Sequence, residues 1–116
     1  DAMYAGARML RILSNTNKKM SALSDGLPKY ESTPEAIVKV TDDTKLRIVE
    51  DVKNDLIAEG YKVIDIDGAR AIIGTGWGLI RASNTGPNLT IKAEAKNISE
   101  ANEILEKIKN LIEKHR

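Results

Sequence analysis

Residues 69–95 read ARAIIGTGWGLIRASNTGPNLTIKAEA. This stretch holds three short segments of strand-like composition, 69–73, 77–82 and 88–95, separated by the turn residues Gly-Thr-Gly and Ser-Asn-Thr-Gly-Pro. Short segments punctuated in this way predict an antiparallel meander. The last segment alternates apolar and polar side chains, as a strand does when one of its faces is buried and the other is wet. The stretch therefore predicts a sheet that is covered on one face.

Working outward, the sequence supplies further strands and the helices that could cover this face. Strands are predicted at 36–40 and 61–66. Asp42 or Asp43 can cap a helix that ends at Gly60, and Ser99 can cap a final helix. The expected apolar stripes of the two helices are Leu46, Val49, Val52, Leu56 and Ile57 in the first, and Ala101, Ile104, Leu105, Ile108, Leu111 and Ile112 in the second. Strands and two amphipathic helices together predict a two-layer α+β domain.

The N-terminal part of the chain has a different character. Helical spacing of apolar residues predicts a helix over 2–13 and a short helical turn over 18–24, followed by an extended stretch from Pro28 to Pro34. The sequence begins with Asp rather than Met and enters a helical pattern at once, so we expect a piece of a longer polypeptide. We interpret this region as a helical arm that precedes the α+β domain.

Composition argues against several classes of function. The 116 residues carry a formal net charge of +1 with acids and bases interspersed, so charge favours neither nucleic acid nor a membrane surface as a partner. The chain has no cysteine, and its only imidazole, His115, is expected in a solvated tail, which excludes a catalytic triad and a multi-histidine metal site. No apolar run approaches the length of a spanning helix, and the cytoplasm is the default location.

Residues 81–87, RASNTGP, carry the clearest chemical signal. The guanidinium of Arg81 offers paired donors to phosphate oxygens, and Ser83, Asn84 and Thr85 can donate to the remaining oxygens. Arg81 and Ser83 point to the same side of a strand, so they can converge on one ligand. The alternative is a polar hairpin turn without a ligand, because all of these turn residues are common in turns.

Two other motifs are interpreted as turns. The run GTGWG at 74–78 lacks the glycine spacing of nucleotide-binding loops and leads into a strand rather than a helix. The run DIDG at 65–68 lacks the further acidic ligands of a cation loop, so we predict a hairpin turn and no metal site there.

The run GWGLIRASNTGP at 76–87 closely resembles the phosphate-binding signature of the C-terminal domain of the alpha-D-phosphohexomutase family, with the phosphomannomutase/phosphoglucomutase branch nearest. The resemblance extends through 66–70, 91–95 and the closing helix, and back to 1–10 and 27–30, so it covers nearly the whole chain. It departs at Gly86, where the family often has Thr or an acidic residue. Asn84 matches the phosphomannomutase/phosphoglucomutase style rather than the glucosamine one.

This resemblance implies a domain organisation. Residues 1–27 would be the helical tail of the family's third domain, residues 28–36 the interdomain hinge, and residues 37–116 the fourth domain, which has a TATA-box-binding-protein-like fold. The whole enzyme would be a four-domain isomerase that interconverts sugar 1-phosphates and 6-phosphates through a bisphosphorylated intermediate.

It also implies a division of roles. Arg81, Ser83, Asn84 and Thr85 would hold the non-transferring phosphate of a hexose phosphate. The catalytic serine, the Mg²⁺ loop and the sugar-recognition loop would lie in the other domains of the same polypeptide, so the fragment alone would be inactive and would bind no Mg²⁺. A free-standing α+β module that binds RNA or a protein, and a structural subunit without a ligand, remain as rival interpretations. The identity of the hexose stays open.

Overall fold

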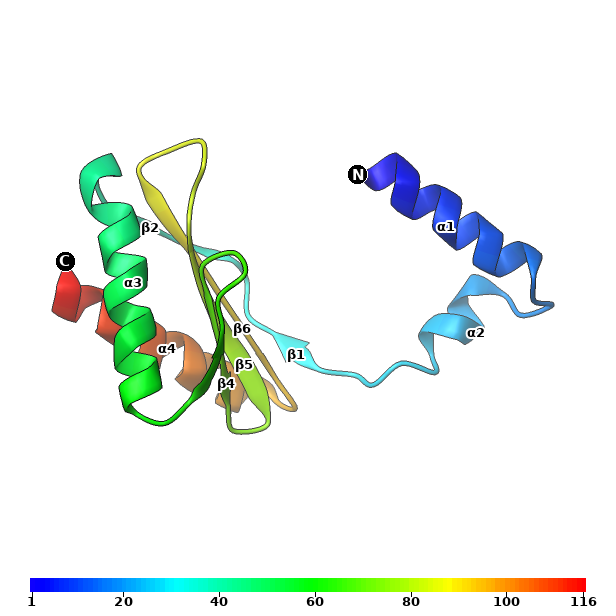
Figure 1. Ribbon diagram of the computed structural model, residues 1–116. Helices are drawn as coiled ribbons and strands as arrows, with labels where there is room; N and C mark the ends of the chain where they lie inside the picture. Colours follow the sequence, from blue (N-terminus) through cyan, green and yellow to red (C-terminus); the bar gives the residue numbers. More distant parts are fainter.

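Two long helices and a six-stranded sheet form the main body of the chain, and a helical arm precedes it (Figure 1). The structure is a computed structural model that describes residues 1–116. Its elements in chain order are α1 (Ala2–Ser14), α2 (Met20–Ser24), β1 (Glu31–Ser32), β2 (Ala36–Lys39), α3 (Asp42–Ala58), β3 (Lys62–Ile64), β4 (Ala69–Ile73), β5 (Gly76–Ala82), β6 (Asn88–Ala95) and α4 (Ile98–His115).

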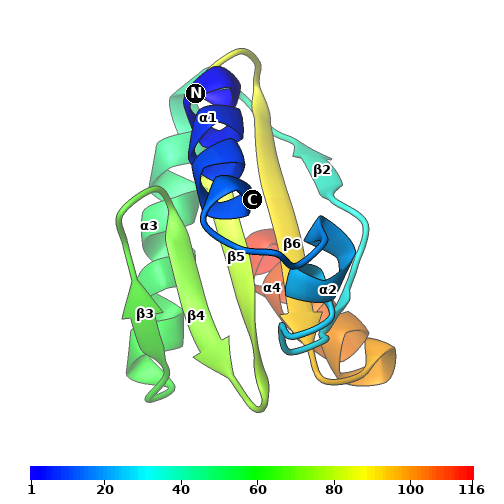
Figure 2. The same ribbon diagram turned by 90° about the vertical axis from the view of Figure 1, so that its right-hand side faces the viewer.

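The sheet is the antiparallel meander that the sequence predicts. Strands β3, β4, β5 and β6 follow one another in sequence and in space, and β6 also pairs with β1 and β2 along its other edge. Helices α3 and α4 lie on one face of the sheet, and the arm lies on the side of the opposite, open face (Figures 1 and 2). The two-layer α+β class is therefore confirmed.

The core lies between the sheet and the two helices and is aliphatic. All four inward side chains of β6 are fully buried, in the alternation that the sequence shows: Leu89, Ile91, Ala93 and Ala95. Gly78 of β5 leaves room for two side chains of α4, because a Cβ at this position would collide with Ile104 and Ile108. The small residue on the strand thus lets large residues on the helix approach the sheet closely.

The apolar stripe of α3 differs from the prediction at both of its ends. Leu46 and Ile57 are 69% and 52% exposed, whereas Ile48, which the prediction omitted, is 1% exposed. The buried residues of the helix are Ile48, Val49, Val52 and Leu56. These four residues lie on one face of the helix. Leu46 is rotated about 200° around the helix axis from Ile48, and Ile57 is rotated about 100° from Leu56, so both lie off this face.

The start of α4 also differs from the prediction. Asn97 caps the helix, because its side chain accepts a hydrogen bond from the backbone N–H of Glu100 at 2.9 Å. Ser99, the expected cap, lies inside the first turn. Asn and Ser are about equally good caps, and it is Asn97 that has the extended backbone of a cap residue.

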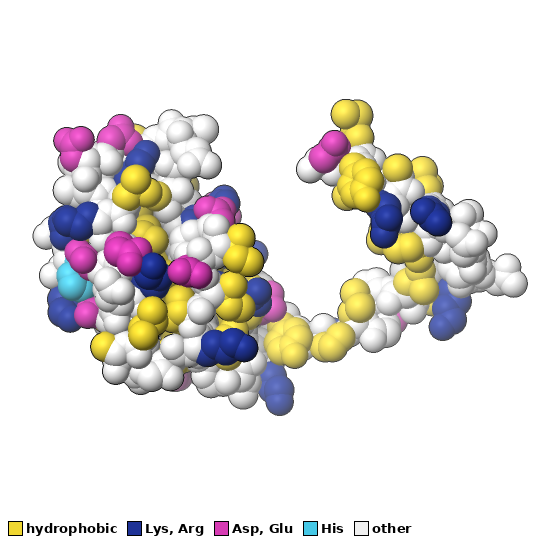
Figure 3. Space-filling view, viewed as in Figure 1, with side chains coloured by type: hydrophobic (Ala, Val, Ile, Leu, Met, Phe, Trp, Pro, Cys, Tyr) yellow, Lys and Arg dark blue, Asp and Glu magenta, His cyan; other side chains and the backbone are white.

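The arm stands apart from the sheet. Helix α1 has no buried residue, and large apolar side chains such as Met3 and Leu10 are exposed on it (Figure 3). The radius of gyration is 17.1 Å, against about 13 Å for a compact domain of this length. Neither this arm nor any other helix combines the length and the apolarity needed to cross a membrane.

The expected linker at 28–36 is partly built into the sheet. Residues 31–32 form β1, and Ala36 begins β2. Between them lies Thr33, 2% exposed, which forms three hydrogen bonds with Ala93 of β6. Its N–H and its hydroxyl donate to the carbonyl of Ala93 at 2.9 and 3.3 Å, and its Oγ1 accepts from the N–H of Ala93 at 3.1 Å. Residues 28–30 of the expected linker precede the first strand of the sheet. The division of the chain into 1–27, 28–36 and 37–116 stays a prediction.

The C-terminal end of α4 is tied to α3 and does not form a solvated tail. His115 is 20% exposed at its side chain, and its Nε2 lies 2.7 Å from Oδ2 of Asp55, which also accepts a hydrogen bond from Lys114 at 2.7 Å. The hydrogen bond from Lys114 and then that of His115 hold the pKa of the Asp55 carboxyl below its usual value. The prediction for His115 was wrong because Asp55, which lies 60 residues earlier in the sequence, holds its side chain.

The lowered pKa of Asp55 predicts an acid-dependent contribution to stability. A carboxyl with a lower pKa in the folded state stabilises the fold above its unfolded pKa of about 3.9, and this stabilisation is lost as pH falls through the folded pKa. Asp55→Asn should therefore be less stable than the parent chain at pH 7, with the difference shrinking at pH 3. Urea unfolding at both pH values measures it. Glu106→Gln, which removes an exposed pair within α4, is the control and should show no such convergence.

Candidate anion-binding site

Arg81 lies on the open face of β5, one residue before the end of the strand. Its strand is hydrogen-bonded on both sides, to β4 and to β6, with Thr90 as its partner in β6. The side chain is 47% exposed. A firmly held backbone thus presents a guanidinium that a ligand can reach.

Asp67, in the turn between β3 and β4, is the partner of Arg81 within the chain. Nη1 of Arg81 lies 3.3 Å from Oδ2 of Asp67, and the Asp67 side chain is 71% exposed. This distance is longer than the 2.7–2.9 Å typical of a strong charged hydrogen bond. An exposed pair of this kind contributes at most about 1 kcal/mol, so an anionic ligand can displace it.

Gly68 allows the turn that carries Asp67 to approach β5. It has a φ of 77°, and a Cβ there would collide with the carbonyl of Ile80 and with the backbone and Cβ of Arg81. Only glycine combines this left-handed conformation with such a close contact. The backbone contact between the turn and the strand therefore sets where Asp67 and Arg81 meet.

The loop at 83–87 continues β5 and returns the chain into β6. The N–H of Ser83 donates to the carbonyl of Asn88 at 2.9 Å, and the N–H of Asn88 donates to the carbonyl of Gly86 at 2.8 Å. The hydroxyls of Ser83 and Thr85 lie 3.4 Å apart. The N–H groups of Asn84 and Gly86 meet no acceptor within the chain. The loop thus offers two hydroxyls and two unused backbone donors.

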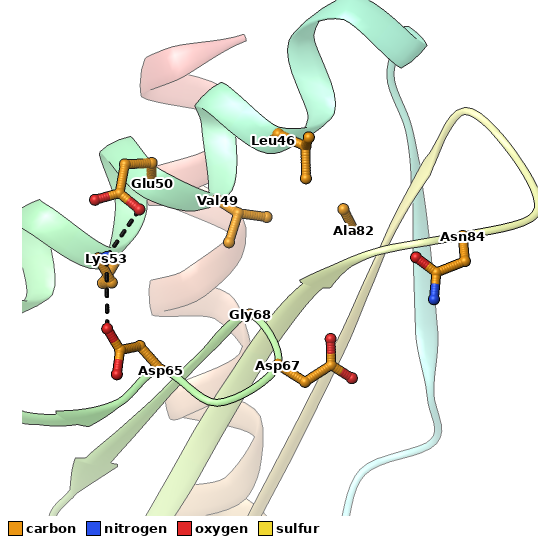
Figure 4. A pocket seen from close by; sticks show the side chains of 9 residues that line it. All are labelled: Leu46, Val49, Glu50, Lys53, Asp65, Asp67, Gly68, Ala82 and Asn84. Atoms are coloured by element: carbon orange, nitrogen blue, oxygen red, sulfur yellow. Dashed lines mark ion pairs between the residues drawn. The ribbon is translucent and has the colours of Figure 1, made fainter.

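Of the four predicted site residues, the structure brings two into contact. Ser83 and Thr85 approach through their hydroxyls, whereas Arg81 forms no hydrogen bond with either of them or with Asn84. Asn84 is exposed and, like Asp67, lines a neighbouring hollow (Figure 4). Arg81 lies in β5, and the other three residues lie in the loop that follows the strand.

The hollow itself, of about 330 Å³, is unsuited to a dianion. Figure 4 shows its lining between α3 and the turn that carries Asp67, with three carboxylates against a single cation. That cation, Lys53, lies 2.8 Å from Glu50 and 3.7 Å from Asp65. The hydrogen bond that Lys53 donates to the carboxylate of Glu50 is the main reason that the pKa of Lys53 is raised. We therefore place the candidate anion site at Arg81 and the loop, not in this hollow.

Two residues that contact the site escaped the sequence analysis. Asp67 was interpreted only as part of a hairpin turn, and Lys45 of α3, whose Nζ donates to the carbonyl of Ser83, was not considered. They lie 14 and 38 residues from their partners. No local pattern links residues so far apart in sequence.

No metal centre is built by these residues. Nowhere in the structure do three or more His, Cys, Asp or Glu side chains come together to hold an ion. The residues of this chain therefore do not fit Mg²⁺, and no step of its function is assigned to that ion.

Comparisons with known proteins connect this geometry to a family. The family described as "Phosphoglucomutase/phosphomannomutase, C-terminal domain" matches residues 35–111. A phosphomannomutase/phosphoglucomutase of Pseudomonas syringae pv. tomato is 41% identical over 104 residues, which are 90% of this chain and 22% of that protein. A probable phosphoglucosamine mutase of Methanosarcina barkeri is 38% identical over 109 residues, which are 93% of this chain and 24% of that protein.

A solved structure shows the same arrangement. A phosphoglucomutase/phosphomannomutase family protein from Burkholderia thailandensis matches 99% of this chain and 24% of its own, with a TM-score of 0.74 and 31% identity. The chain thus spans about a quarter of the length of the relatives it matches. On the family match and these similarities, the chain belongs to the phosphoglucomutase/phosphomannomutase C-terminal domain family.

Proposed function

We propose that this chain is the substrate-phosphate-binding domain of a phosphohexomutase that interconverts hexose 1-phosphates and 6-phosphates through a bisphosphorylated intermediate. The observation that carries the proposal is the half-exposed guanidinium of Arg81 at the start of a loop with unused N–H donors. Family membership supports the assignment of these donors to a phosphosugar. The whole enzyme would be an isomerase, and this chain alone would not catalyse the reaction.

In this proposal the domain binds the phosphate that is not transferred. Arg81 makes charge-assisted hydrogen bonds to its oxygens, and Ser83, Asn84 and Thr85 fix its orientation. The binding energy gained there positions the other end of the sugar at the catalytic serine of another domain. Mg²⁺, which the family's chemistry implies, would be held by residues outside this chain, and the enzyme would act in the cytoplasm.

The surface of the domain gives less support to the rival RNA-binding function than to phosphate binding. The only tryptophan, Trp77, lies on the open face of the sheet, but the guanidinium of Arg70 lies 4.4 Å from its ring centroid, and its Nε1 donates to Glu94 at 3.3 Å. A stacking platform for bases needs a free aromatic face. Figure 3 shows acidic and basic side chains interspersed over the visible face of the domain, rather than one basic patch.

Titration of the 116-residue chain with inorganic phosphate, followed by ¹⁵N–¹H NMR, tests the proposed function. We expect amide shifts confined to residues 81–86 and to the turn at 65–68, with a dissociation constant on the order of 1 to 10 mM. Shifts centred elsewhere, or no response below 50 mM phosphate, would contradict a phosphate site at Arg81.

The same titration with Asp67→Asn sharpens the test. Removing this carboxylate frees Arg81 and removes a negative charge beside the anion, so phosphate should bind about 2- to 5-fold more tightly. Weaker binding in this variant would mean that Asp67 orients Arg81 for the ligand instead of competing with it.

A further inference from the structure

Lys45 connects helix α3 to the loop at 83–87. Its Nζ lies 2.7 Å from Oδ1 of Asp42, 2.9 Å from the carbonyl of Ser83 and 3.4 Å from that of Gly86. The side chain is only 16% exposed. Because an ammonium group has three N–H donors, these three acceptors satisfy all of them. Lys45 is therefore committed to the loop and is not available as a ligand for an anion.

The bond to the carbonyl of Ser83 has a geometric consequence for the next residue. The peptide between Ser83 and Asn84 is trans, as are all others in the chain. In a planar trans peptide the C=O and N–H groups point in opposite directions. When Lys45 holds the carbonyl of Ser83, the N–H of Asn84 must point away from Lys45.

That N–H is one of the two loop donors without an acceptor in the chain. Helix α3, which carries Lys45, lies on the face of the sheet opposite to the open face from which Arg81 projects. An ammonium bonded to a carbonyl also polarises the peptide and strengthens its N–H as a donor. The second contact, to the carbonyl of Gly86, fixes the other end of the loop.

We propose that Lys45 is a positioning residue for phosphate binding: by holding the carbonyls of Ser83 and Gly86, it directs the N–H of Asn84 toward the phosphate that Arg81 binds. This inference rests on the proposed function. It adds a residue from α3 and a backbone donor to the side chains of 81–85, and it assigns Asp42 the role of counterion to Lys45.

Phosphate titration of Lys45→Met in the 116-residue chain tests the proposal, with Lys53→Met as the matched control. Lys53 lies on the same helix, is 19% exposed and pairs with an acidic residue three positions earlier, as Lys45 does, but it has no hydrogen bond to the loop. We expect Lys45→Met to bind phosphate about fivefold more weakly, the effect of one lost hydrogen bond, and the response of the Asn84 amide to vanish. Lys53→Met should bind as the parent does.

The outcomes separate this proposal from the proposed function. If the parent chain responds at 81–86 while Lys45→Met binds within twofold of it with an unchanged Asn84 response, the role of Lys45 is wrong and the phosphate site stands. If no amide of the parent chain responds to phosphate, both the proposed phosphate site and the proposed role of Lys45 are wrong. If Lys45→Met does not fold, the parent chain alone still tests the proposal. Phosphate should move the resonance of its Asn84 amide proton downfield. An Asn84 amide proton that does not shift would overturn the proposal.

Discussion

Arg81→Ala in a full-length enzyme that contains this domain is expected to lower kcat/KM roughly 30- to 900-fold. This range corresponds to a loss of about 2 to 4 kcal/mol of transition-state stabilisation. Arg81 is the only proposed ligand that carries a charge, and the variant removes the pair of N–H donors that its guanidinium can direct at a phosphate. Steady-state kinetics with a hexose 1-phosphate measure the effect. The loss should appear without a change in the fold, because the side chain is half exposed and pairs only with Asp67.

Arg70→Ala is the control for this substitution. Arg70 lies on the neighbouring strand β4 and on the same open face, opposite Leu79 of β5, but its guanidinium covers Trp77. Removing it should cost the contact with Trp77 and leave kcat/KM within about threefold of the parent enzyme. Equal losses in the two variants would show that a general positive charge on this face, and not a site at Arg81, assists the reaction.

Gly68→Ala is expected to destabilise the domain by about 3 kcal/mol or more. The left-handed conformation alone costs an alanine about 1 to 2 kcal/mol, and the added Cβ would also collide with the backbone of Ile80 and Arg81. Denaturant unfolding of the 116-residue chain measures the loss. Because the collision falls on Arg81 itself, phosphate binding should weaken in the same variant under conditions where it is still folded.

Gly60→Ala separates the two parts of this effect. Gly60 follows α3 with a φ of 86°, and no atom lies within 4 Å of the position that its Cβ would take. This variant should lose only the conformational part, about 1 to 2 kcal/mol, and should keep the phosphate affinity. If both variants lose the same stability, the contact between the β3–β4 turn and β5 is looser than the structure shows.

The strands could be predicted from the sequence because their signals are local. The alternation from Leu89 to Ala95 and the turn residues before Asn88 fix β6 without knowledge of its partners. The helix faces could be predicted only in part. Leu46 and Ile57 are as apolar as Ile48, and the position of α3 on the sheet decides which of them is buried. The choice between Asn97 and Ser99 as a cap likewise depends on where the chain leaves β6.

The predicted side chains of the site were local too, whereas the residues around them were not. Arg81, Ser83, Asn84 and Thr85 follow one another in the chain, and their chemistry can be interpreted from their order. The contacts of Lys45 with the loop and of Asp67 with Arg81 arise only when α3 and the β3–β4 turn are folded against the sheet. Such contacts depend on tertiary structure and leave no trace in a single sequence.

The hydrogen bonds between Thr33 and Ala93 connect the arm mechanically to the strand that follows the loop at 83–87. They anchor the incoming chain to β6, and the same strand begins at Asn88, directly after the loop that follows Arg81. A reorientation of residues 1–30 therefore pulls on a strand that is paired along both edges. The sheet and the loop at 83–87 would therefore move together as one rigid body.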